Sequence, residues 1–162
     1  MERRTTNAEK RVFRAAYIKH ILDICPNSIL TLGMGRPCKP EILSRKIDHF
    51  FKCIHREAYG RNWHKRDSVE GIVAIGVYEH LASNTHVHFA LKAPTPFARS
   101  ALDRGERIWR KIRPGAHYYY DGIKDPEKYA CYITKEIWRE EVRDSVYYFN
   151  RPDMRGPHRK IQ

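Results

Sequence analysis

Two histidines separated by one residue lie in a stretch whose composition is typical of a β-strand. Residues Thr85–Lys92 are rich in β-branched and aromatic side chains, alternate with period two, and include no Gly or Pro. Because a strand sends residues i and i+2 to the same face, His86 and His88 are expected to point the same way. Two imidazoles on one face can chelate a divalent metal. The alternative is a surface strand with two unrelated histidines.

A third ligand is expected from the strand that precedes the histidines, because a hard catalytic ion also favours a carboxylate oxygen. That strand ends in Glu79 and His80, and the hairpin register decides which of them reaches the site. A two-residue turn at Ser83 and Asn84 places Glu79 opposite His88 and on its face, and a four-residue loop keeps this register. A three-residue turn would instead place His80 opposite His88.

A tyrosine and a lysine lie three residues apart in the predicted helix Asp125–Glu140. At about 100° per residue, the apolar residues of this helix form one stripe, from which Tyr132 points away toward Lys128, Lys135 and Glu136. A phenol is a poor nucleophile at neutral pH, since its pKa is about 10. It can attack a phosphodiester when a metal polarises the phosphate and a cation supports the developing charge. The alternative is an exposed tyrosine on a solvated helix face.

The order of these two groups resembles a known enzyme family. His86-Val87-His88, followed by Tyr132-Ile133-Thr134-Lys135-Glu136, resembles the motifs of HUH endonucleases of the rolling-circle replication initiator (Rep) type. In those proteins a His-hydrophobic-His strand precedes a helix with a Tyr-x-x-Lys motif, and a first, weaker motif is a strand similar to Ile29–Leu32. The similarity runs from about Ser28 to Glu140, which is most of the chain.

The resemblance implies an α+β fold in which a central, mainly antiparallel sheet of about five strands is flanked by helices, akin to ferredoxin-like folds. It implies a metal-dependent, site-specific endonuclease and strand transferase that uses Mn²⁺ or Mg²⁺. Tyr132 would be the nucleophile, supported by Lys135, and would form a 5′-phosphotyrosine intermediate. His86 and His88 would bind the metal, and Glu79 is expected as the third ligand because similar Rep proteins carry an acidic ligand near the end of this strand.

The implied substrate is single-stranded DNA, usually presented in an origin hairpin of a plasmid or virus. The chain has no Walker A sequence, so a separate helicase would have to unwind duplex DNA. The resemblance places such a protein in the cytoplasm of a bacterial host, or in the nucleus for a eukaryotic virus. Single-strand transposases share the order of the His and Tyr motifs and remain an alternative.

Two other tyrosines are weighed against Tyr132. Relaxases of the mobilisation type place their tyrosine before the His motif, where this chain has Tyr17, but Tyr17 lacks a Lys companion and is expected to be structural. Some Rep families use two tyrosines. Tyr129 is the candidate for a second, although its place nearer the apolar stripe favours a packing role.

The charge of the chain indicates a polyanionic partner. Lys and Arg number 31 against 19 Asp and Glu, which gives a net charge of +12. Contacts to the DNA backbone are predicted for Arg61, Lys65 and Arg66, in the loop before a long strand, and for Lys128. A different class of function is a non-catalytic module that stacks single-stranded bases on the tyrosines at 118–120.

The elements that must position these residues fit one domain over residues 1–149, followed by a basic tail at 150–162. Helices are predicted at 6–24, 40–59, 95–112 (with a weak point at Gly105) and 125–140, and strands at 28–34, 69–80, 85–92, 116–123 and 146–149. This order lacks a regular βαβ alternation and therefore indicates an antiparallel sheet. Four scattered cysteines favour reduced thiols, and no membrane span or secretory signal is predicted.

Overall fold

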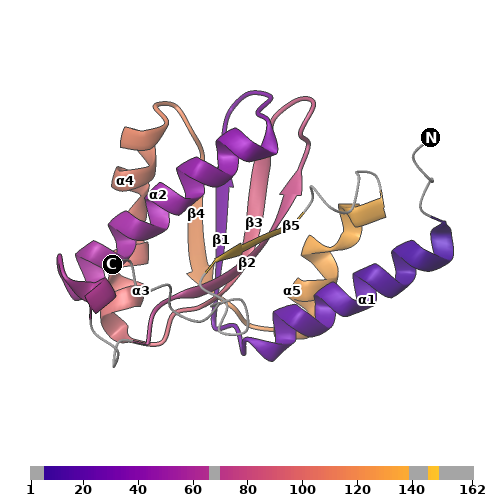
Figure 1. Ribbon diagram of the computed structural model, residues 1–162, viewed down its shortest axis with the longest axis horizontal. Helices are drawn as coiled ribbons and strands as arrows, with labels where there is room; N and C mark the ends of the chain where they lie inside the picture. Colours follow the sequence, from indigo (N-terminus) through magenta and orange to yellow (C-terminus); the bar gives the residue numbers. More distant parts are fainter. Residues whose placement is uncertain (1–5, 66–69, 139–145, 150–162) are drawn as a thin grey trace, which may run out of the picture.

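The computed structural model describes residues 6–65, 70–138 and 146–149 (Figure 1). The helices are α1 (Asn7–Asp23), α2 (Pro40–Tyr59), α3 (Pro96–Asp103), α4 (Gly105–Ile112) and α5 (Pro126–Ile133), with the 3₁₀ turns η1 (Trp63–Lys65) and η2 (Lys135–Trp138). The strands are β1 (Ser28–Gly33), β2 (Val73–Glu79), β3 (His86–Lys92), β4 (Tyr118–Gly122) and β5 (Val146–Phe149). Arg66, Val69 and the tail 150–162 lie outside the described residues. None of the described helices is both long and apolar enough to cross a membrane.

The strands of the described residues form one antiparallel sheet in the order β4-β1-β3-β2-β5. The succession β1-α2-β2-β3-α3/α4-β4 is the βαββαβ unit of ferredoxin-like folds. To this unit the chain adds α1 before β1, and α5 and β5 after β4. The predicted fold class, an α+β protein with a central antiparallel sheet flanked by helices, is confirmed.

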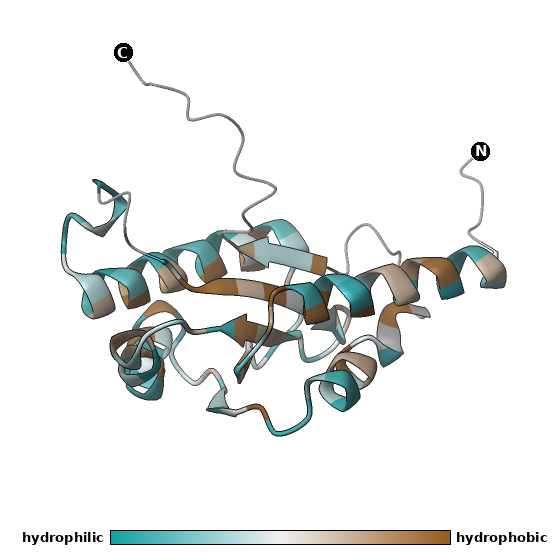
Figure 2. Cartoon of the chain, turned by 90° about the horizontal axis from the view of Figure 1, so that it is seen from below, coloured by the Kyte–Doolittle hydropathy of each residue, from teal (hydrophilic) through white to brown (hydrophobic). Residues whose placement is uncertain are grey.

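The helices cover the two faces of the sheet unequally. α2, α3 and α4 pack on one face over the larger apolar cluster, to which Phe51, Phe89 and Trp109 belong. α1 and α5 lie side by side on the other face over a smaller cluster that includes Ile21 and Ile133 (Figure 1). Figure 2 shows the most hydrophobic segments in the strands between these helices. The smaller cluster covers only part of its face, which leaves room for polar residues on β2 and β3.

The long helix α2 forms for reasons that are visible in its sequence. Its apolar residues recur at helical spacing and are fully buried under the sheet: Leu43, Ile47, Phe50, Phe51 and Ile54. Pro40 occupies the first helical position, and Gly60, with φ of 87°, ends the helix. α1 begins close to its predicted start, with a capping box between Thr6 and Glu9.

The helix predicted over 95–112 is two helices, α3 and α4, which meet at Arg104. The break brings Gly105 against Tyr118, whose hydroxyl donates a hydrogen bond to the Leu102 carbonyl (2.5 Å). A Cβ at Gly105 would overlap the Tyr118 ring and hydroxyl, so any larger residue would have to displace the Tyr118 side chain.

The helix predicted over 125–140 is shorter than expected. α5 starts after Asp125, which accepts a hydrogen bond from the Lys128 amide, and ends at Ile133. The Thr134 hydroxyl donates to the Ala130 carbonyl (2.7 Å), and the chain then tightens into η2. Residues 139 and 140 lie outside the described part of the chain. The consequence is that Lys135 follows the end of the helix rather than lying within it.

The hairpin of β2 and β3 has a different register from the predicted one. Glu79 pairs with His86, and Val77, rather than Glu79, pairs with His88. The connection is longer than the turns considered, because β2 ends before His80, which has φ of 55°. The shift is an even number of residues, so Glu79 stays on the face that carries both histidines.

Candidate active site

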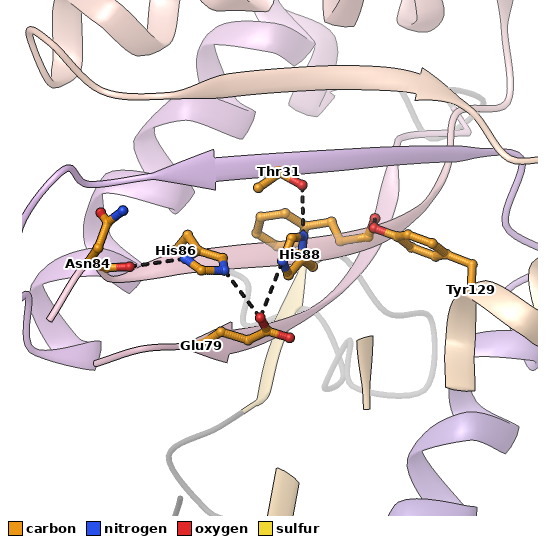
Figure 3. Close-up of polar contacts among 7 residues, drawn as sticks. Thr31, Glu79, Asn84, His86, His88 and Tyr129 are labelled. Carbon is orange, nitrogen blue, oxygen red and sulfur yellow. Dashed lines mark hydrogen bonds and ion pairs between the residues drawn. The ribbon is translucent and has the colours of Figure 1, made fainter. Parts of the chain in front are cut away.

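Three possible metal ligands meet where β2 ends and β3 begins (Figure 3). The Glu79 Oε2 atom lies 3.2 Å from His86 Nε2 and 3.5 Å from His88 Nε2. One ligand atom from each residue can be chosen so that all three lie within 4.8 Å of one another. Such a cluster of two imidazoles and one carboxylate is chemically suited to a divalent ion.

The two imidazoles are oriented by partners on their other ring nitrogens. His86 Nδ1 donates to the backbone carbonyl of Asn84 (3.0 Å), and His88 Nδ1 is hydrogen-bonded to the Thr31 hydroxyl (2.8 Å) on β1 (Figure 3). These contacts turn both Nε2 atoms toward Glu79, an arrangement that is typical of metal-binding histidines. The sequence prediction missed Thr31 and Asn84. The only signal for Thr31 is a polar residue in the middle of an apolar strand.

The electrostatics of the cluster fit a bound cation. Glu79 is only 2% exposed, and its Oε1 atom is buried without a hydrogen-bond partner among the described residues. Burial opposes the charge of Glu79, but hydrogen bonds with His86 and His88 hold the pKa of this carboxyl below its usual range. The hydrogen bond to Glu79 raises the pKa of His86, although burial opposes this. A buried anion with an unused oxygen beside two imidazole nitrogens leaves room for a positive charge.

The predicted nucleophile lies next to this cluster. The Tyr132 ring contacts the His88 ring, with centroids 5.9 Å apart and the planes near perpendicular. The Lys135 ammonium lies 3.8 Å from the centroid of the Tyr132 ring, and the tyrosine is 48% exposed. Tyr132 therefore combines access from solvent with direct contact to a candidate metal ligand. The structure brings together the five predicted residues Glu79, His86, His88, Tyr132 and Lys135.

The other two tyrosines considered as nucleophiles serve packing. Tyr129 is largely buried on α5, and its hydroxyl donates to the Phe89 carbonyl (3.3 Å) of β3. Burial raises the pKa of Tyr129 far above that of a free phenol. Tyr17 packs from α1 against the smaller apolar cluster, as expected for a structural residue.

A groove of about 390 Å³ adjoins Tyr132 between the end of β4 and α5. Most of its lining is apolar, from residues such as Ile29 and Tyr129, and its charged residues are two lysines and two aspartates: Lys124, Lys128, Asp121 and Asp125. Lys128, one of the residues predicted to contact DNA, therefore lies beside the candidate nucleophile. An apolar groove with a few polar groups at its edge is typical of a site for a small organic group.

Arg61 and Lys65 are not brought to this site. They lie in the segment that leads to the start of β2, whereas Glu79 is the last residue of that strand. Seven strand residues span about 23 Å. Trp63, between them, packs against His55 of α2 with ring centroids 4.4 Å apart, which places this segment beside the helix that covers the opposite face.

The three consecutive tyrosines of β4 do not form one stacking surface. Residues alternate along the strand, so Tyr118 and Tyr120 pack against the larger apolar cluster while Tyr119 is 47% exposed on the other face. Tyr119 is paired with Thr31, which is itself paired with His88, so it lies in the same cross-strand row as the candidate ligand. The prediction of a three-tyrosine platform is wrong, and Tyr119 alone is available for stacking on this strand.

The arrangement has the parts that a metal-assisted attack on a phosphodiester needs. The cluster of two imidazoles and one carboxylate lies at one end of the sheet, in contact with Tyr132, and the Lys135 ammonium lies on the ring of that tyrosine. The sequence matches no model of a protein family, no curated protein and no solved structure.

Proposed function

We propose that this protein is a metal-dependent, site-specific single-stranded DNA endonuclease and strand transferase of the HUH type, which initiates rolling-circle replication. One observation carries the proposal. The ring of Tyr132 contacts His88 of the Glu79–His86–His88 cluster, and the ammonium of Lys135 lies on that ring. A tyrosine, a cation and a set of metal ligands in mutual contact are the parts of a phosphotyrosine-forming site.

In the proposed reaction, the Tyr132 oxygen attacks the scissile phosphorus and loses its proton to solvent. The bond between phosphorus and the 3′-oxygen breaks as the bond to Tyr132 forms, and the 3′-oxygen takes up a proton. The products are a 5′-phosphotyrosine and a free 3′-hydroxyl. The Lys135 ammonium supports the negative charge that develops beside the tyrosine ring. Glu79, His86 and His88 would hold an Mn²⁺ or Mg²⁺ ion, which polarises the phosphate when bound.

The reverse reaction accounts for strand transfer. The phosphotyrosine retains the energy of the cleaved phosphodiester, so a second 3′-hydroxyl can attack it and release Tyr132. A 3′-hydroxyl that instead leaves the site can prime DNA synthesis. Under this proposal the DNA site is single-stranded or presented in a hairpin, and a separate helicase unwinds duplex DNA.

Catalysis explains the structure better than DNA binding alone. DNA binding alone does not require a buried carboxylate such as Glu79. Its side chain is 2% exposed, and its Oε1 atom lacks a hydrogen bond within the described residues. Burying such a group costs about 1–3 kcal/mol if it stays unpaired. A divalent ion would offset this cost. Among the β4 tyrosines only Tyr119 is exposed, so base stacking there is also limited.

The experiment that tests the proposal is incubation of the protein with a random single-stranded DNA library in the presence of Mn²⁺ or Mg²⁺. Strands that remain attached to the protein on a denaturing gel are recovered and sequenced. The expected result is a metal-dependent adduct whose DNA begins at one sequence at its 5′ end. The absence of any adduct with both metals, under conditions where the protein binds DNA, would contradict the proposal.

A further inference from the structure

α5, the helix that carries Tyr132, is short, and its C-terminal end is held from a distant part of the chain. The helix has eight residues, fewer than an isolated helix needs for stability, and its last carbonyls lack partners within the helix. Arg14 of α1 supplies partners at this end. Its Nη2 donates to the Cys131 carbonyl (3.0 Å), and its Nε donates to the Thr134 hydroxyl (3.3 Å).

These two contacts lie on either side of the candidate nucleophile. Cys131 directly precedes Tyr132, and Thr134 directly precedes Lys135. In the described part of the chain no hydrogen bond holds the Tyr132 hydroxyl, and the side chain is half exposed. The position of the hydroxyl therefore depends on the backbone from Cys131 to Thr134, which Arg14 contacts.

The position of Arg14 is itself fixed by packing. Ile21 lies two turns later on α1, on the same side of the helix, and is fully buried with Ala130 and Ile133 of α5. The positive guanidinium also interacts favourably with the carbonyl end of the α5 dipole. Its forked geometry serves two acceptors at once, which the single ammonium of a lysine cannot do with the same geometry.

We propose that Arg14 is a positioning residue that holds the C-terminal turn of α5, so that Tyr132 and Lys135 face the Glu79–His86–His88 cluster. This inference rests on the proposed function, because it assigns Arg14 a part in the attack by Tyr132. It makes the N-terminal helix, which lies outside the ferredoxin-like unit, a working part of the active site.

The test compares Arg14→Lys with Arg11→Lys, a matched change at an exposed arginine of the same helix that also preserves charge. With saturating single-stranded oligonucleotide and Mn²⁺, Arg14→Lys should slow single-turnover adduct formation by about 10- to 100-fold, since small misplacements of a reacting group have such effects. The Kd for DNA should be unchanged, and Arg11→Lys should react like the wild type. Amide hydrogen exchange of residues 131–135, without DNA or metal, should be faster in Arg14→Lys.

A second pair of variants keeps the test independent of Arg14 itself. Thr134→Val removes the hydroxyl that Arg14 contacts and should slow adduct formation. Thr134→Ser retains this hydroxyl and should react at the wild-type rate. The loss in the double variant Arg14→Lys/Thr134→Val should be smaller than the product of the two single losses, because both changes disrupt the contact between Arg14 and Thr134.

An unchanged rate in Arg14→Lys, with an active wild type, would overturn this inference alone. A weaker Kd, with a rate that returns to the wild-type value once the oligonucleotide concentration saturates the variant, would also overturn it and make Arg14 a DNA contact. A wild-type protein that forms no adduct would overturn the proposed function and this inference with it, so the wild-type reaction separates the two failures.

Discussion

The site is assembled from single residues whose neighbours determine what they can do. Tyr129 and Tyr132 lie three residues apart on α5 and have rings 6.3 Å between centroids, yet their environments differ. The Tyr129 hydroxyl donates to the Phe89 carbonyl in a buried position, whereas Tyr132 is exposed beside Lys135. This contrast makes Tyr129 a natural control for Tyr132.

We expect Tyr132→Phe to lower formation of the covalent protein–DNA adduct by more than about 1,000-fold, because phenylalanine lacks the attacking oxygen. DNA binding should survive, since the ring and the contact with His88 remain. Adduct on denaturing gels is the measurement. Tyr129→Phe should keep most of the adduct. If Tyr129→Phe abolishes the adduct and Tyr132→Phe does not, the nucleophile is Tyr129.

The metal cluster gives a second prediction at this scale. Glu79→Ala removes the only carboxylate of the cluster and should raise the Mn²⁺ concentration for half-maximal cleavage by about 10- to 100-fold, with the fold intact. Titration of cleavage against Mn²⁺, with circular dichroism as a check of folding, measures this. The matched control is His80→Ala, because His80 is exposed and lies outside the cluster although its ring is near His86. Unchanged metal dependence in Glu79→Ala with a large loss in His80→Ala would identify His80 as the ligand.

At the scale of elements, α2 and the segment before β2 are joined by a buried histidine. His55 is fully buried, its Nδ1 donates to the Phe51 carbonyl (2.8 Å), and its Nε2 accepts from the Ile72 amide (3.0 Å). This pattern requires a neutral ring with the proton on Nδ1. Burial lowers the pKa of His55, although the hydrogen bond to Phe51 opposes this. The ring is packed among Tyr59, Trp63 and Phe149, which bring no charge to it.

His55 is therefore expected to make the stability depend on pH. Because the pKa is lower in the folded chain, the unfolded chain binds more protons below about pH 6.5. The contribution of His55 is complete above that pH, and falls on acidification by up to about 1.4 kcal/mol per pH unit until the folded pKa is reached. Urea unfolding between pH 7.5 and 5 measures the slope. His55→Gln, which keeps a donor and an acceptor without titrating in this range, should flatten it, and an equal slope in both proteins would contradict the assignment.

At the scale of the whole molecule, the dominant property is the net charge of +12. A field of this size attracts polyanions without regard to sequence, whereas the proposed site-specific chemistry would depend on the geometry at one end of the sheet. The basic residues are also widely spread, since Lys128 lies beside Tyr132 while Arg61 and Lys65 lie near the other end of β2.

We expect the affinity for single-stranded DNA to fall steeply with salt, because bound cations are released from the phosphates. Lys128→Ala should reduce the slope of log K against log salt by about 0.7, the value for one contact to a single strand. The double variant Arg61→Ala/Lys65→Ala should leave the slope unchanged for a short oligonucleotide at the site and reduce it for a longer one that reaches the far end of β2. Fluorescence anisotropy at several salt concentrations measures both slopes. A flat salt dependence would argue against a phosphate-dominated interface.

The sequence by itself determined the class of fold and the faces of its elements. The periods of a strand (two residues) and of a helix (3.6 residues) are local properties of the sequence. They predict that His86 and His88 share one face, that the apolar stripe of α2 is buried and that Tyr132 points away from the core. The predicted placement of Glu79 on the histidine face is correct although the register differs, because a shift by an even number of residues keeps a side chain on the same face. Two helix ends were predicted wrongly, because the cap at Thr134 and the break at Gly105 depend on side-chain contacts.

Only the tertiary structure decided which distant residues meet. The pairing of Thr31 with His88, the contact of Tyr132 with His88 and the contacts of Arg14 with Cys131 and Thr134 join residues far apart in the chain. The separation of Arg61 and Lys65 from the site has the same origin. Such pairings depend on the sheet register and on the two apolar clusters that position the helices on the sheet. Both result from many weak contacts between distant residues rather than from a local sequence pattern.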